Sequence, residues 1–394
     1  MKGFEEVRAA GSPRRLLWQA LGVASAAAII AASALSRCGR EELQPGGVAA
    51  TAPGPSNAAA AGIPIIDVHV HLSPQGVPRL MRLMARYGVG SVVNLSGGHP
   101  LSGLDEQLEA AARHPGQIIV FTTLAYEQAR YPDYGARMAQ LVRMARSRGA
   151  RGLKIAKALG LGLRDANGKR IAVDDPALDP VFETAGELGM PVAIHTGDPE
   201  AFWLPVDERN PRRDELEAHP GWSLYGKEVP SFEGLSAELE ARIARHPRTT
   251  FISVHFGNAA ERPERVANLL RKYPNLYIDT AARIPEIGRH SPSAMRAFFI
   301  EFQDRILYGS DLGVGPEPTP LFLGSQGRDP PTDAERERFF SASRRYFETA
   351  DREFDHPTPI QGNWKISGIA LPRGVLAKIY HDNAVRLLEL KEGP

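Results

Sequence analysis

The sequence contains almost no cysteine: Cys38 is the only one among its 394 residues. One thiol cannot form a disulfide within the chain, and it cannot supply the several thiolates of a structural zinc site. A metal ion in this protein would therefore need imidazole and carboxylate ligands.

An excess of charge of one sign is also missing, because 47 lysines and arginines face 46 aspartates and glutamates. A domain that binds nucleic acid usually carries a clustered basic surface, so we expect no nucleic-acid partner. The shares of hydrophobic residues, 43%, and of charged residues, 24%, are those of an ordinary globular protein. A chain of this length holds one large domain or two modest ones.

Residues 1–38 have the pattern of an export segment. Arg8, Arg14 and Arg15 precede the apolar run Leu16–Leu35, and a basic region before an apolar region is typical of a secretory signal. We therefore expect an exported protein that is periplasmic or attached to a membrane.

Three fates of this segment stay open. Ala32–Ala34 fits the small-x-small pattern of a cleavage site. Leu35–Cys38 resembles a lipoprotein box in which Cys38 would be lipidated, although Arg37 stands where a small residue is expected. The apolar run also approaches the about 20 residues that span a bilayer, so it could remain as an N-terminal membrane anchor.

Residues 39–62 are rich in Gly, Ala and Pro and contain few large apolar side chains. Such a segment has little to bury and is predicted to be a flexible linker. The folded domain is therefore expected to comprise residues 63–394.

From residue 63 onward, short apolar runs rich in β-branched residues alternate with segments of helical periodicity. Several runs are too continuously apolar for a sheet with one face in water, which favours parallel strands covered on both faces. Eight such runs predict an α/β fold of the (β/α)₈, or TIM-type, barrel class, with a doubly wound open sheet as the alternative. The predicted strands are Ile65–Leu72, Val89–Ser96, Ile118–Leu124, Ala150–Lys157, Pro191–Gly197, Thr250–Phe256, Leu276–Ala282 and Ile306–Gly313.

Two segments after predicted strands are longer than ordinary loops: residues 198–234 after the fifth strand and 312–333 after the eighth. Both leave the carboxyl ends of strands, where barrel active sites are built. We expect Trp203, Arg209 and Trp222 of the first segment to contact substrate. The alternative is a solvated loop anchored by its tryptophans.

Histidines and one aspartate stand at the carboxyl ends of four predicted strands. His69 and His71 lie two residues apart, so both rings face the same side of the first strand. His195, His255 and Asp311 end the fifth, sixth and eighth strands. Because these ends meet at one mouth of a barrel, the pattern predicts a divalent metal site, with Zn²⁺ first and Mn²⁺ or Fe²⁺ as alternatives.

Several segments, in this order, resemble the amidohydrolase superfamily. The similarity is to its amidohydrolase-related branch (amidohydrolase family 2), which includes enzymes like aminocarboxymuconate semialdehyde decarboxylase. It extends over nearly all of the chain from residue 63. The matching segments are IIDVHVHL (Ile65–Leu72), GLKI (Gly152–Ile155), PVAIHT (Pro191–Thr196), FISVHFG (Phe251–Gly257), ILYGSD (Ile306–Asp311) and IYHDNAVRLL (Ile379–Leu388).

The resemblance implies a role for each strand-end residue. It assigns His69, His71, His195 and Asp311 to one metal ion. Asp311 would also shuttle a proton. His255 would bind a second metal in binuclear members; in mononuclear ones it would act on substrate or bound water. On chemical grounds alone, His255 could polarise the attacked group or stabilise developing charge.

Lys154 and Arg283 are the remaining candidates for the site. Lys154 lies in the fourth strand among apolar neighbours, where a charged amine is costly to bury. In some branches of the superfamily this lysine is carbamylated and bridges two metals; the other reading is a contact with substrate or a pair with Asp67. Arg283, just beyond the seventh strand, could clamp a substrate carboxylate.

The sequence thus predicts a metal-dependent hydrolase that attacks an amide, ester or lactone bond of a small molecule with metal-activated water. Non-oxidative decarboxylation of a small carboxylic acid on the same scaffold is the alternative. A non-catalytic exported binding protein is a third reading, which the complete set of strand-end ligands argues against. A homo-oligomer is compatible with the sequence.

Overall fold

The computed structural model describes residues 60, 62–327 and 329–390. The predicted export segment, Cys38 and the linker up to residue 59 lie outside the described residues. Ala60 is buried, and its carbonyl accepts a hydrogen bond from the backbone N–H of Ile63 at 3.1 Å. None of the described helices is long and apolar enough to cross a membrane.

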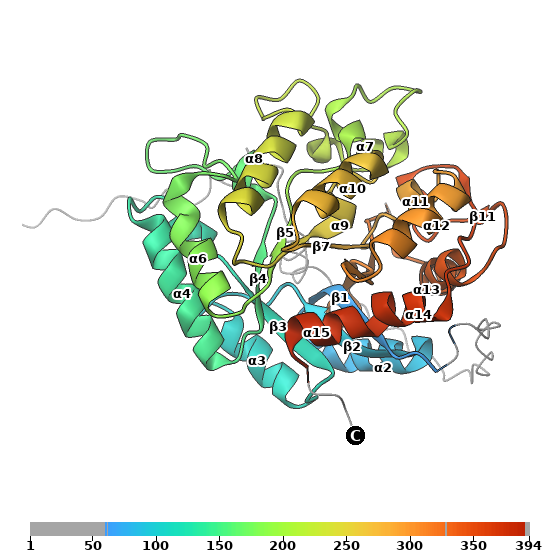
Figure 1. Cartoon of the computed structure of the whole chain (residues 1–394), viewed down its shortest axis with the longest axis horizontal. Coiled ribbons are helices and arrows are strands. Elements are labelled where there is room, and N and C mark those ends of the chain that lie inside the picture. Colours follow the sequence, from blue (N-terminus) through green and yellow to red (C-terminus); the bar gives the residue numbers. More distant parts are fainter. Residues whose placement is uncertain (1–59, 61, 328, 391–394) are drawn as a thin grey trace, which may run out of the picture.

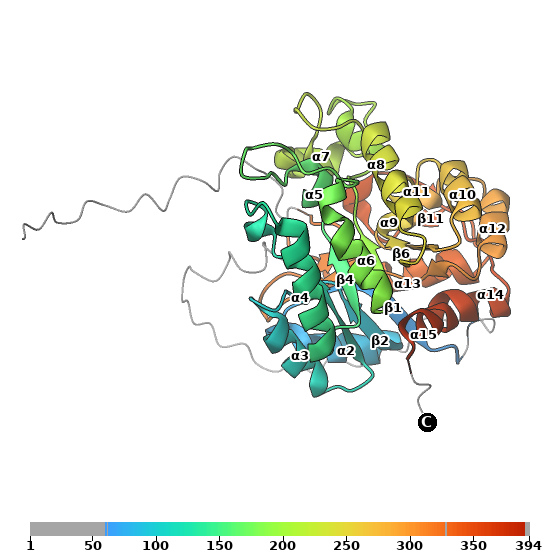
Figure 2. The same cartoon turned by 60° about the vertical axis from the view of Figure 1, so that its left-hand side comes forward.

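The centre of the fold is a curled sheet of parallel strands that neighbour one another in sequence order (Figures 1 and 2). Each strand pairs in parallel with the next one along the chain. In the described part of the chain these strands are β1 (Ile65–Leu72), β2 (Val89–Asn94), β3 (Ile118–Thr123), β4 (Gly152–Ile155), β5 (Val192–Ile194), β6 (Phe251–Ser253), β7 (Leu276–Asp279) and β8 (Ile306–Leu307).

The sheet closes where the eighth strand meets the first. Beyond β8 the chain continues as β9 (Leu312–Val314), which pairs in parallel with β1. The chain between β8 and β9 is also hydrogen-bonded to β1. Tyr308 O accepts from Val68 N, and Asp311 N donates to His69 O, both at 2.9 Å. The predicted (β/α)₈ barrel is therefore confirmed.

Helices cover the outside of the barrel (Figures 1 and 2). In the first of them, Leu80 and Met84 stand four residues apart and are both buried, as expected for the inner face of an amphipathic helix. Gly88 ends that helix with a φ of 69°, a left-handed conformation that glycine adopts without strain. The longer helices of the described residues are α2 (Val77–Tyr87), α3 (Leu104–Ala112), α4 (Tyr134–Arg148), α6 (Asp179–Glu187), α8 (Phe232–Arg245), α10 (Pro263–Lys272), α12 (Pro292–Glu301) and α13 (Asp333–Glu348).

The C-terminal segment packs against the strands themselves. Ala384 and Leu388 join a cluster of buried apolar residues from β1, β2, β3, β5, β6 and β8. This C-terminal segment consists of α14 (Arg373–Ala377), the π-helical turn η7 (Lys378–Asp382) and α15 (Asn383–Leu388).

Strands β5 and β6 end earlier than predicted, just before the polar residues of interest. The backbone of His255 and Phe256 has a φ of 57°, and that of Asp311 has a φ of 66°. A left-handed conformation cannot continue an extended strand, so pairing stops there. His255 and Asp311 consequently stand in irregular backbone beyond β6 and β8, and His195 directly follows β5, whereas His69 and His71 lie within β1.

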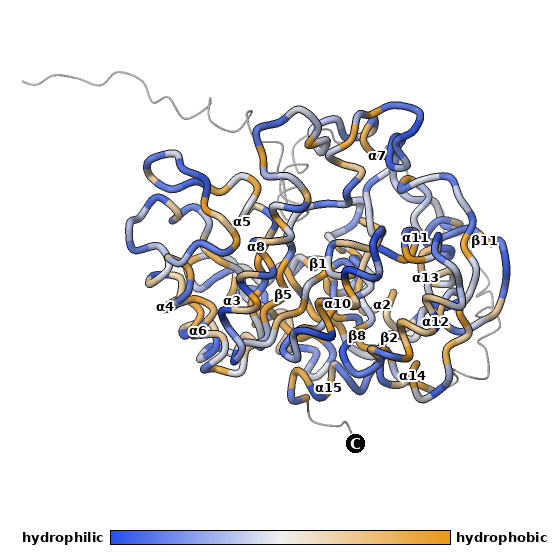
Figure 3. The backbone as a smooth tube through the Cα atoms, turned by 45° about the horizontal axis from the view of Figure 1, so that its top comes forward, coloured by the Kyte–Doolittle hydropathy of each residue, from blue (hydrophilic) through white to orange (hydrophobic). Residues whose placement is uncertain are grey.

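The two long segments predicted after the fifth and eighth strands are present. The first contains η4 (Glu200–Trp203), α7 (Arg213–Ala218) and η5 (Pro220–Trp222) before α8 begins. The second contains β9 and β10 (Phe322–Leu323), which pair antiparallel. Figure 3 shows hydrophobic segments gathered along the strands and many hydrophilic stretches in the outer loops, including those near α7.

Leu388→Ala should test the packing of α15 on the barrel. Leu388 is 3% exposed, and removing its buried methyl groups should lower the free energy of unfolding by about 2–5 kcal/mol. Leu101 is 56% exposed, so Leu101→Ala serves as the control and should change it by less than about 0.5 kcal/mol. Denaturant unfolding followed by circular dichroism measures both, and equal losses would contradict the packing role of α15.

Candidate functional site

His69, His71 and Asp311 form a compact group whose potential ligand atoms all lie within 4.8 Å of one another. Asp311 Oδ1 lies 3.4 Å from His69 Nε2 and 3.3 Å from His71 Nε2. The two histidines come from the end of β1, and Asp311 precedes β9, the strand that pairs with β1. The first and eighth strands therefore meet at these three residues, which the sequence analysis predicted to be metal ligands.

His195 and His255 lie beside this group but are not members of it. The His255 ring centre is 4.7 Å from that of His69 and 4.3 Å from that of His195. His195 thus adjoins His255 and, within the described residues, lies outside the compact group of His69, His71 and Asp311. The Nε2 atoms of His69 and His195 are nevertheless both buried and have no hydrogen-bond partner among the described residues.

The rings of His71 and His255 are held through their Nδ1 atoms. His71 Nδ1 lies 2.7 Å from Ser96 Oγ, and His255 Nδ1 lies 3.0 Å from the carbonyl oxygen of Ala281. A carbonyl oxygen only accepts, so His255 Nδ1 carries a proton and donates it. In the neutral ring, His255 Nε2 then keeps its lone pair.

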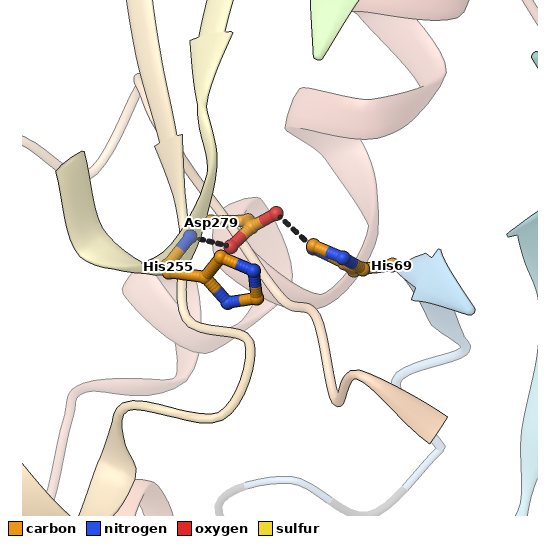
Figure 4. Close-up of side chains that lie close together, drawn as sticks. All are labelled: His69, His255 and Asp279. Carbon is orange, nitrogen blue, oxygen red and sulfur yellow. Dashed lines mark hydrogen bonds and ion pairs between the residues drawn. The ribbon is translucent and has the colours of Figure 1, made fainter. Parts of the chain in front are cut away.

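Asp279, at the end of β7, is a site residue that the sequence reasoning missed. Its Oδ2 lies 2.8 Å from His69 Nδ1, and its Oδ1 accepts from the backbone N–H groups of His255 at 2.7 Å and Ala281 at 3.1 Å (Figure 4). With His69 and His255 it forms a second compact group of potential ligands. The sequence did contain a signal for it, since Asp279 is the one carboxylate inside the apolar run Leu276–Ala282. A carboxylate buried in a strand needs polar partners, which would have placed it near other polar groups.

The buried histidines are neutral at neutral pH. Burial lowers the pKa of His69, and the positive charge of Lys154 lowers it further against the opposing effect of nearby carboxylates. Burial likewise holds the pKa values of His195 and His255 well below 6.5, with neighbouring positive groups acting in the same direction. Neutral imidazole is the form that binds a metal ion.

Asp311, by contrast, is ionised. Burial by itself would raise the pKa of its carboxyl, but the hydrogen bond with His71, and the positive charge that the surrounding histidines carry when protonated, lower the pKa below its usual range. A carboxylate that stays ionised beside neutral imidazoles suits both metal binding and the acceptance of a proton.

These groups open into a cavity of about 500 Å³. A cavity of this size accommodates a small organic molecule. Polar residues of the candidate site line part of it: His71, Lys154, His195, His255, Arg283 and Asp311. Apolar side chains form much of the remaining wall, among them Leu95, Leu161, Phe202, Trp222 and Leu224.

Of the loop residues predicted to contact substrate, Trp222 lines this cavity and the other two do not. Trp203 donates from Nε1 to the carbonyl oxygen of Pro230 at 2.9 Å, so it anchors the loop. Arg209 has a side chain that is 88% exposed and pairs with Asp207. Arg209 is therefore a solvated loop residue, as the alternative interpretation of this segment expected.

Lys154 is buried beside the cavity, and its Nζ has no hydrogen-bond partner among the described residues. Burial lowers the pKa of this amine to about 8, against the opposing effect of Asp279 and Asp311. The suggested pair with Asp67 is wrong, because the Asp67 carboxylate accepts from Ser310 Oγ at 2.5 Å and Ser310 N at 3.0 Å.

Arg283 is a second buried cation at the cavity, with 6% of its surface exposed. Its Nη1 donates to the carbonyl oxygen of Ala282 at 3.0 Å. Among the described residues, no carboxylate lies within ion-pair distance of Arg283 or of Lys154. Two buried cations of the described residues therefore border the cavity without a carboxylate partner.

Comparisons with known proteins are consistent with this architecture. A family model described as Amidohydrolase matches residues 66–390. No relative was found among curated protein sequences. Among solved structures, 2,6-dihydroxybenzoate decarboxylase from Rhizobium is 17% identical, with 83% of this chain and 98% of that chain covered and a TM-score of 0.47. A putative amidohydrolase from Staphylococcus aureus is 16% identical, with 83% and 100% covered and a TM-score of 0.48.

The double variant His69→Ala/His71→Ala should lose a tightly bound metal ion, because it removes two of the three members of the compact group. Elemental analysis of the wild-type protein should show about one divalent ion per chain, as expected for a single four-ligand site. His114, which follows α3 and belongs to neither group, gives the control His114→Ala with unchanged metal content. Full metal content in the double variant would rule out a site on these histidines.

Proposed function

Because this chain belongs to the amidohydrolase family, whose model covers residues 66–390, we propose that it is a hydrolase of an amide, ester or lactone bond in a small molecule. The observation that carries the proposal is the position of the Asp311 carboxyl group. It lies against His69 and His71 and lines the cavity. A fixed base at the edge of a cavity is what the activation of water requires.

The residues fit one divalent metal ion, held by His69, His71, His195 and Asp311. The buried Nε2 atoms of His69 and His195 have no partner among the described residues, which supports a ligand role for both. When bound, a divalent ion supplies Lewis acidity that polarises a carbonyl group and lowers the pKa of water to about 7. Imidazole and carboxylate donors suit Zn²⁺, with Mn²⁺ and Fe²⁺ as alternatives.

One ion is proposed rather than two. The second compact group shares His69 with the first, and there His69 Nδ1 is already engaged by Asp279 at 2.8 Å. A bridge between two ions by carbamylated Lys154 remains the less favoured alternative. The lowered pKa of Lys154 makes the neutral amine that carbamylation needs more accessible.

Asp311 is the proposed proton carrier. Its backbone is fixed by two hydrogen bonds, from its own N–H to His69 O at 2.9 Å and from Gly324 N–H to its carbonyl at 3.2 Å. The side chain can accept a proton from the attacking water and return it to the leaving group as the scissile bond breaks.

His255 is proposed to accept a hydrogen bond rather than to donate one. Its Nδ1–H is committed to Ala281 O, and its low pKa keeps the ring neutral, so Nε2 offers a lone pair. It can therefore orient a water molecule or a substrate hydroxyl group. Orienting a water molecule agrees with the action on water or substrate that the resemblance implies for mononuclear members, whereas a neutral acceptor differs from the polarising role expected on chemical grounds.

Substrate recognition is proposed to depend on Lys154 and Arg283. Two buried cations without a carboxylate partner favour a substrate with an anionic group, which would compensate their burial. Trp222 and the other apolar residues of the wall would contact the rest of the molecule. The convergence of these groups with Asp311 argues against a protein that only binds.

Non-oxidative decarboxylation is the second candidate, and the same two cations favour it. They could hold a substrate carboxylate before its carbon–carbon bond breaks and CO₂ leaves, with a proton taken up at the carbon. Export by residues 1–38 with Cys38 lipidated, cleaved or anchored, and assembly into a homo-oligomer, remain proposals from the sequence.

Asp311→Asn should fold and retain part of the metal, because asparagine keeps the shape and one oxygen ligand but is not basic. The turnover number should fall by about 10²–10⁴, the usual contribution of a positioned general base. Steady-state kinetics at matched metal content measures this loss, with His114→Ala as a control that should keep full activity. Near-normal turnover in the Asn variant would move proton transfer to another group.

The two candidate reactions make different products. Metal-loaded protein should be incubated with lactones, esters, amides and aromatic acids in H₂¹⁸O. Hydrolysis should place ¹⁸O in a product carboxylate without release of CO₂, because water attacks the acyl carbon. Release of CO₂ in proportion to substrate loss would reject the hydrolase and support the decarboxylase.

A further inference from the structure

The buried carboxylate of Asp279 joins two histidines that come from different strands. Its Oδ2 lies 2.8 Å from the ring nitrogen Nδ1 of His69, which is part of β1. Its Oδ1 lies 2.7 Å from the backbone nitrogen of His255, beyond β6, and 3.1 Å from that of Ala281. The side chain has no solvent exposure, and Figure 4 shows it between the two histidines.

The contact with His69 has a consequence for the position of one proton. A carboxylate has no proton to donate, so Asp279 Oδ2 accepts in the contact with His69, as Oδ1 does in its contacts with two backbone N–H groups. His69 Nδ1 must then carry the proton, because a neutral imidazole has one protonated and one unprotonated nitrogen. The lone pair is left on Nε2, the nitrogen that lies 3.4 Å from Asp311 Oδ1.

The contact with His255 concerns the backbone. His255 and Phe256 both have a φ of 57°, a conformation that residues other than glycine rarely adopt. The hydrogen bond from His255 N–H to Asp279 Oδ1 ties the start of this left-handed turn to the end of β7. The ring of His255 is attached at that point.

We propose that Asp279 is a positioning residue with two separate effects. Through Oδ2 it selects the tautomer of His69 in which Nε2 is free to act as a ligand. Through Oδ1 it holds the left-handed turn that carries His255. The statement about the tautomer stands without the proposed function, whereas its effect on metal binding rests on the proposed metal site.

The first test reads the His69 tautomer in metal-free wild-type protein. Histidine labelled with ¹⁵N gives long-range ¹H–¹⁵N spectra in which protonated and unprotonated ring nitrogens have different shifts. The His69 signals are assigned by their loss in His69→Gln. We expect Nδ1 protonated and Nε2 unprotonated, and the reverse assignment would overturn the proposal.

The second test uses Asp279→Asn, which separates the two effects. Asparagine keeps one oxygen for the backbone N–H groups of His255 and Ala281, but it presents an NH₂ group to His69. His69 Nδ1 must then accept, so the proton should move to Nε2. We expect this switch in the spectra, a Tm near that of the wild type, and Zn²⁺ affinity lower by about 10–100-fold in chelator competition.

Asp279→Ala removes both effects and should lower the Tm in addition, because the turn at His255 loses its acceptor. Ser96→Ala is the matched control. It removes the Nδ1 partner of His71 and leaves that of His69, so the His69 tautomer should stay as in the wild type. A switch at His69 in Ser96→Ala would show a general disturbance of the site and overturn the specific role of Asp279.

The outcomes also separate this proposal from the proposed function. A wild-type protein that binds no Zn²⁺ refutes the metal site, while a tautomer switch in Asp279→Asn still supports the positioning role. An unchanged His69 tautomer in Asp279→Asn overturns the positioning role whatever reaction the protein catalyses. Equal Zn²⁺ affinity in the wild type and Asp279→Asn overturns its effect on the metal site.

Discussion

The burial of charge at the mouth of the barrel is the constraint on which this structure depends. A carboxylate removed from water costs several kcal/mol unless hydrogen bonds replace the lost water. Asp279 meets this requirement with three N–H donors, and Asp311 meets it through His71, whose Nε2 lies 3.3 Å from Asp311 Oδ1. Because each partner belongs to the candidate site or its backbone, the contacts that make burial tolerable also fix the geometry of the site.

The barrel and the meeting of its strand ends could be predicted from the sequence. Apolar runs separated by helical periodicity specify parallel strands in chain order, and the carboxyl ends of such strands converge whatever their separation in sequence. His69, His71 and Asp311 meet for that reason alone. The proximity of His69 and Asp279, 210 residues apart, has the same origin, although the sequence reasoning passed over the aspartate.

Contacts that depend on rotamers and on the path of a loop could not be predicted. A pair of Lys154 with a barrel carboxylate such as Asp67 was one reading of the sequence, but Lys154 Nζ has no hydrogen-bond partner among the described residues, and the backbone and hydroxyl of Ser310 donate to the Asp67 carboxylate. Trp203 was expected at the substrate, yet its indole N–H anchors the loop on Pro230. Periodicity records which face a residue occupies. It carries no information on which of several neighbours the side chain reaches.

The segment between β5 and α8 separates the cavity wall from the reactive groups in the sequence, and this separation has an evolutionary consequence. Phe202, Trp222 and Leu224 of the cavity wall come from it, whereas the compact group of ligands comes from the ends of the first and eighth strands. Substitutions in this one segment can therefore change which molecules enter, while the reactive groups are inherited intact. A lineage built on this scaffold could acquire new substrates without rebuilding its chemistry.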